Sequence, residues 1–85
     1  MATAQEIKLA KTYVAASKAM ADYLENDGES ISDERTDELC DAEMDAEVAI
    51  VDFLIKKGHV KGEDAAALRF ASETVAKTFA QKALA

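Results

Sequence analysis

The chain has 85 residues, a formal net charge of −7 and a hydrophobic fraction of 49%, which together indicate one small acidic domain, residues 1–85, with a single core. Its lone cysteine, Cys40, excludes an internal disulfide, so a reducing, cytoplasmic location is expected. No run of about 18 apolar residues is present, which argues against a membrane span, and the acidic balance argues against direct nucleic-acid binding.

The negative charge is concentrated in one segment. Residues 22–47 contain twelve of the seventeen acidic residues and one basic residue, Arg35, so this segment has a formal charge of −11. The rest of the chain is mildly basic. Such segregation bears on the partners of a protein more than on its fold.

The first helix is predicted over residues 4–26. Thr3 and Glu6 have the spacing of a capping box, which marks a helix start. Two apolar rows follow at helical spacing and together form a wide stripe. The first row is Ile7, Ala10, Val14, Ser17, Ala21 and Leu24, and the second is Leu9, Tyr13, Ala16, Met20 and Tyr23.

The second helix is predicted over residues 33–57. Asp27-Gly28-Glu29-Ser30 reads as the preceding turn, and Ser32 is the expected N-cap before Asp33 and Glu34. At the other end, two lysines precede Gly58. A glycine after the last helical turn favours the left-handed conformation that closes a helix.

The third helix is predicted over residues 63–84, beginning at Glu63 and Asp64. Its expected core stripe is Leu68, Ala71, Ser72, Val75 and Phe79. Three long helices joined by short loops favour an all-α fold, a small antiparallel three-helix bundle. Because the third helix has few large side chains, the alternative is a helical hairpin that completes its core by dimerising.

Six carboxylates of the second helix share one face. At 100° per residue they fall within an arc of about 100°, and we call this set the acidic ridge: Glu34, Asp37, Glu38, Asp41, Asp45 and Asp52. One interpretation is a solvated face that keeps a small protein soluble. The other is a surface that docks on a basic protein, because like charges on one helix cost stability.

Glu43 and Glu47 project instead into the apolar stripe of the same helix. Carboxylates there must be paired, hydrated or protonated, and salt bridges to Lys18, Arg69 or Lys77, or a subunit interface, are expected. A carboxylate metal site is the alternative. Bundle metal sites usually add Glu-x-x-His motifs, and the only histidine is His59, in a loop, so no metal is expected.

Other side chains receive simpler interpretations. Phe70 falls on the polar side of the third helix, where it would act as a contact anchor for a partner. Cys40 is expected to be a small buried hydrophobe. The sequence contains no nucleophile beside a base and no phosphate-binding glycine loop, so neither an enzyme nor a cofactor is expected.

One short motif has a family resemblance. Gly28-Glu29-Ser30-Ile31, before an acidic helix, resembles the phosphopantetheine-attachment motif of acyl carrier proteins, which are small, acidic and helical. The family motif has Asp where Glu29 stands, and it leads into a shorter helix. The resemblance implies a carrier function with Ser30 as the attachment site.

The sequence favours a non-enzymatic interaction module that docks its acidic ridge, with Phe70 as an anchor, on a basic protein surface, as an inhibitor or nucleic-acid mimic would. Small acidic helical proteins of phages and mobile elements often act in this way, which is an association only. The alternative is a structural or self-assembling subunit, a homo-oligomer, that uses the apolar face around Glu43 and Glu47. The carrier function is a third, remote reading.

Overall fold

The computed structural model describes residues 2–26 and 33–85, and these fold as four α-helices: α1 (Ala4–Asn26), α2 (Asp33–Gly58), α3 (Gly62–Phe70) and α4 (Ser72–Ala83). The described part of the chain contains no strand, so the all-α prediction is confirmed. The expected turn at 27–30 and the expected N-cap Ser32 lie outside the described residues, as does Ser30, the residue of the acyl-carrier resemblance.

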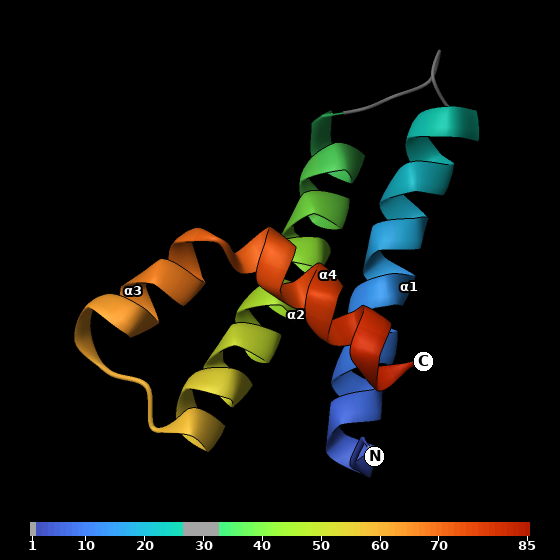
Figure 1. Ribbon diagram of the computed structural model, residues 1–85. Helices are drawn as coiled ribbons and strands as arrows, with labels where there is room; N and C mark the ends of the chain where they lie inside the picture. Colours follow the sequence, from blue (N-terminus) through green and yellow to red (C-terminus); the bar gives the residue numbers. More distant parts are fainter. Residues whose placement is uncertain (1, 27–32) are drawn as a thin grey trace.

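Helices α1 and α2 lie side by side and run in opposite directions, and α4 crosses both of them obliquely (Figure 1). The core forms where these three helices meet. It consists of Ala10, Tyr13, Ala46, Ile50, Ala76, Phe79 and Ala80. Helix α3 lies to one side and contacts α2 and α4, and the whole molecule is elongated, 45 × 28 × 15 Å.

The start of α1 is the capping box predicted from the sequence. The Thr3 backbone N–H donates to Glu6 Oε1 at 3.1 Å, and the Glu6 N–H donates back to Thr3 Oγ1 at 3.2 Å. Lys57 Nζ lies 3.5 Å from the same Glu6 carboxylate and 5.7 Å from the centre of the Phe53 ring. This contact joins the beginning of α1 to the end of α2.

The end of α2 differs from the prediction by one residue. Gly58 is helical, and the left-handed residue is His59, with φ of 52°. The Val60 N–H donates to the Ile55 carbonyl at 3.0 Å and the His59 N–H to the Lys56 carbonyl at 3.4 Å. These two bonds form a Schellman motif with His59 at its C′ position, so the expected role of Gly58 belongs to His59.

The predicted helix over 63–84 is two helices, and a three-helix bundle is therefore not confirmed. The break falls at Ala71, which has φ −99° and ψ 29°. Neither Gly nor Pro marks it. Ala71 is exposed rather than in the core, and α4 buries Ala76, Phe79 and Ala80. Phe79 packs edge-to-face on Phe53, with ring centres 6.0 Å apart.

Two further predictions about burial are corrected. The wide apolar stripe of α1 is covered only in part. Ala10 is fully buried and the row of Leu9, Tyr13, Ala16, Met20 and Tyr23 is buried or half-buried, but Val14 and Leu24 are 42% and 50% exposed. Cys40 is exposed, not buried, and its neighbour Leu39 is the buried residue instead.

Candidate protein-docking surface

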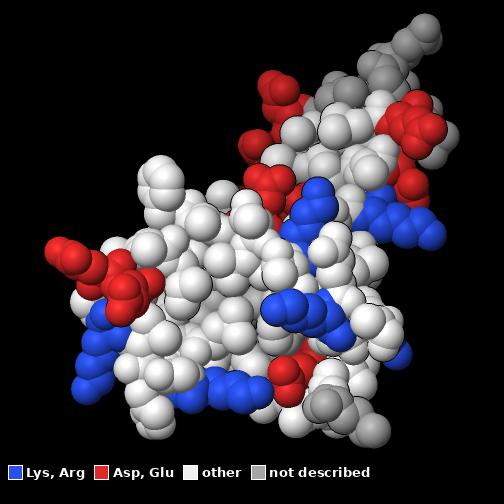
Figure 2. All heavy atoms as spheres, in the orientation of Figure 1, with Lys and Arg blue, Asp and Glu red and all other residues white. Residues whose placement is uncertain are grey.

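The structure places all six residues of the acidic ridge on the exposed face of α2. Among the residues described, the ridge makes one ion pair, from Glu38 Oε2 to Arg35 Nη1 at 3.2 Å, and both side chains of that pair are more than half exposed. Several of the acidic groups visible in Figure 2 gather at the protruding end where α1 finishes and α2 begins. The ridge is therefore a solvated and mostly uncompensated surface of negative charge.

Two apolar side chains accompany the ridge and were not singled out from the sequence. Met44 and Val48, one helical turn apart, are 60% and 48% exposed. At 100° per residue, Met44 lies about 20° from Asp37 and Val48 about 20° from Asp41. This helical projection could have identified the two residues from the sequence alone. The ridge thus has an apolar pair along one side, which a purely solubilising face does not need.

Phe70 is 96% exposed. It is the last residue of α3, so it belongs to a different helix from the ridge. A lone exposed aromatic residue is common on protein surfaces.

Glu43 and Glu47 lie on the inner side of α2 and are half-buried. Glu47 Oε1 accepts a hydrogen bond of 2.9 Å from Ser72 Oγ, at the start of α4. Neither carboxylate forms an ion pair within the described residues; the expected partners Lys18, Arg69 and Lys77 do not reach them. The partner of Glu47 is therefore the Ser72 hydroxyl of α4, where a cation was expected from the sequence.

Electrostatics in this inner cluster oppose ionisation. Burial raises the pKa of Glu43, and the neighbouring carboxylates of Glu47 and Glu73 raise it further. Burial also raises the pKa of the Tyr13 phenol, with added contributions from Glu47, Glu43 and Glu73. Within the described residues no three His, Cys, Asp or Glu side chains are grouped closely enough to hold a metal ion. The cluster therefore contains repelling carboxylates beside a neutral phenol.

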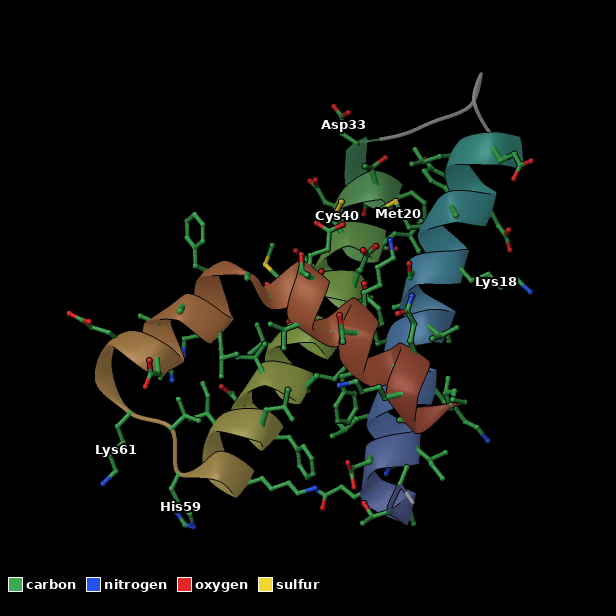
Figure 3. All side chains as sticks on the ribbon, in the orientation of Figure 1. Lys18, Met20, Asp33, Cys40, His59 and Lys61 are labelled. Carbon is green, nitrogen blue, oxygen red and sulfur yellow. The ribbon has the colours of Figure 1, made fainter. Side chains whose placement is uncertain are left out.

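A groove of about 560 Å³ lies between α1 and α4. It is lined from α1 by residues 13, 14, 17, 18 and 21, and from the last helix by residues 77, 80, 81 and 84. Its only charged lining residues are Lys18 and Lys77, one on each helix. Lys18 extends from α1 on the side away from α2 (Figure 3). These are the lysines that were expected from the sequence to pair with Glu43 and Glu47, and the groove was not predicted.

Comparisons with known proteins leave this surface to be interpreted from its own chemistry. No protein-family model, no curated protein and no solved structure matches the chain. In the described part of the chain, no helix has both the length and the apolar character that crossing a bilayer requires.

Proposed function

We propose that the protein is a non-enzymatic interaction module that docks the acidic ridge of α2 on a basic surface of another protein, as an inhibitor or nucleic-acid mimic does. The observation that supports this proposal is the row of six exposed carboxylates with one compensating cation, Arg35. Complementary charge speeds encounter and selects partners.

The stability cost of the ridge adds to this support. Like charges four residues apart on a helix destabilise it by about 0.2–0.5 kcal/mol per pair. The ridge contains three such pairs: Glu34 with Glu38, Asp37 with Asp41, and Asp41 with Asp45. A cationic partner would relieve this repulsion. Interleaving lysines would have made the face equally soluble without the repulsion.

The alternative, a self-assembling subunit that uses the face around Glu43 and Glu47, has less support. That face is already half-buried inside one chain, against Ser72 of α4 and near Tyr13 of α1.

The test is a comparison of two variants that lose the same charge. The ridge variant is Asp37→Asn, Glu38→Gln, Asp41→Asn and Asp45→Asn. The control variant is Asp22→Asn, Glu25→Gln, Glu63→Gln and Asp64→Asn, at exposed positions on α1 and α3. Proteins captured from the source cells by the wild type are purified, and their affinities are measured at about 50 mM and about 200 mM salt.

The expected result is that the ridge variant binds a basic partner at least about tenfold more weakly, a loss of about 1.4 kcal/mol, while the control variant changes affinity by less than about threefold. Circular dichroism checks that both variants keep their helices. Equal affinity of the wild type and a folded ridge variant would refute the proposal.

A further inference from the structure

The groove between α1 and α4 is an unusual surface for so acidic a protein. Val14 and Leu84, on opposite walls, are each 42% exposed. The buried side chains of Tyr13 and Ala80 also line it, so its interior is apolar. Its charged side chains are both cations, although acidic residues outnumber basic ones seventeen to ten in the whole chain.

The groove has the form of a receptor for a helix. Its two walls come from helices that cross obliquely, α1 and α4 (Figure 1), and Ser17 and Ala21 are small enough to let another backbone approach. Amphipathic helices bind such grooves by inserting apolar side chains spaced one turn apart, while charged groups on the rim select the partner. An occupant must therefore carry an i, i+4 apolar pair flanked by carboxylates.

The acidic ridge has this pattern. Met44 and Val48 are an exposed i, i+4 pair, and on the helical projection Asp41 lies about 20° from Val48 and Asp45 about 60° from it. The pair would fill the apolar interior of the groove, and the two aspartates would face the ammonium groups of Lys18 and Lys77. The two surfaces therefore carry matching groups, apolar side chains beside opposite charges.

The two surfaces of one molecule cannot meet. Met44 and Val48 lie about 120–160° around α2 from the buried Ala46 and Ile50, and α2 contributes no residue to the groove. We propose that the acidic ridge of one copy, with Met44 and Val48, docks into the α1/α4 groove of a second copy. This inference rests on the proposed function, because the same ridge is the docking surface, and it adds a specific partner.

Because ridge and groove are different surfaces, the contact is heterologous. Each molecule can give its ridge to one neighbour and receive a ridge from another, so assembly is either a closed ring or an open chain. The net charge of −7 on each copy opposes close approach and keeps the assembly weak and concentration-dependent.

Charge exchange tests the contact directly. The groove variant is Lys18→Glu/Lys77→Glu, and the exchanged-ridge variant is Asp41→Lys/Asp45→Lys. In each variant alone, the ridge and the groove carry charges of the same sign and repel each other. In a mixture, the ridge of either variant meets a groove of opposite charge on the other variant. Sedimentation velocity from about 10 µM to about 1 mM covers the affinities of weak assemblies.

The wild type is expected to associate, and each variant alone is expected to associate at least about tenfold more weakly. The equimolar mixture is expected to associate again.

Lys8→Glu/Lys11→Glu is the matched control, because it removes the same charge from exposed positions of α1 outside the groove. It should associate like the wild type, apart from a small effect of net charge. A wild type that stays monomeric at about 1 mM, or a mixture that associates no more than its components, would overturn the inference.

The two proposals fail in distinguishable ways. If the groove variant still binds a basic partner protein but the wild type does not self-associate, the inference is wrong and the proposed function stands. If self-association depends on the ridge but no other protein binds to the ridge, the proposed function is wrong and the inference stands.

Discussion

At the scale of single residues, the Glu43 carboxyl group is the least favourably placed charge described. It is half-buried, beside Glu47 and Glu73, and its pKa is raised mainly by burial. The Glu6 carboxylate is the opposite case: the backbone N–H of Thr3, with the Thr3 hydroxyl and Lys57, lowers its pKa. These two residues give pH dependences of opposite sign.

Glu43→Gln should stabilise the protein at pH 7. The substitution removes a like-charge contact with Glu47, worth about 0.2–0.5 kcal/mol for residues one turn apart, together with the cost of desolvating the carboxylate. Because the folded-state pKa of Glu43 is raised, its penalty is present at pH 7 and disappears below the ordinary pKa of glutamate. Chemical denaturation at pH 7 and at about pH 4 measures the difference.

The stabilisation by Glu43→Gln should therefore be larger at pH 7 than at the lower pH. Glu25→Gln, at an exposed position on α1, is the control and should show a smaller dependence. The contribution of Glu6 runs in the other direction, since a lowered pKa gives stability that is lost as the pH falls through it. A Glu43→Gln benefit that is the same at both pH values would contradict the burial of this carboxylate.

At the scale of the helices, sequence signals located the starts of α1 and α2 because each start has a local chemical cause. The capping box at Thr3 and Glu6 and the acidic first turn of α2 act within one turn of the chain. The break at Ala71 has no such cause. Leu68, Ala71, Ser72, Val75 and Phe79 keep helical spacing across it, so the pattern predicts one helix. The bend at Ala71 lets α4 cross both α1 and α2. It therefore depends on tertiary packing, which the local sequence pattern does not contain.

The helix end at His59 gives a second prediction. A non-glycine residue in the left-handed region is strained by its Cβ, so His59→Gly should stabilise the protein by about 0.5–1 kcal/mol. Gly62 has φ of 62°, and Gly62→Ala should therefore destabilise by a similar amount. Thermal unfolding of both variants measures the two signs. If Gly58 were the left-handed residue, His59→Gly would not stabilise.

At the scale of the whole molecule, the core is small and built largely from alanine. Four of its seven buried residues are alanines, and the largest fully buried side chains are Ile50 and Val51. The sequence indicated this thinness from its composition. The groove between α1 and α4 could not be predicted, because it depends on where α4 lies. The exposed pair Met44 and Val48 could have been found beside the ridge from the helical projection alone.

The substitution Ile50→Ala should therefore destabilise the protein strongly. Removing a fully buried isoleucine costs about 2–5 kcal/mol, a large part of the stability of a small domain, and should lower the melting temperature by more than about 10 °C. Val48→Ala, at a position 48% exposed, should change the free energy of unfolding by less than about 0.5 kcal/mol. Similar melting temperatures for the two variants would show that the core is elsewhere.

Because α4 lies over the part of the α1/α2 pair that contains Ala10, Tyr13 and Ile50 (Figure 1), the chain is not equally protected along its length. At the end where α1 finishes and α2 begins, Leu39 is buried, but no described residue there belongs to the core cluster, and several exposed carboxylates lie there. Local opening is easiest where few tertiary contacts hold a helix. Amide protons there should exchange with solvent through sub-global openings, while those of Ile50 and Phe79 require unfolding of the whole molecule.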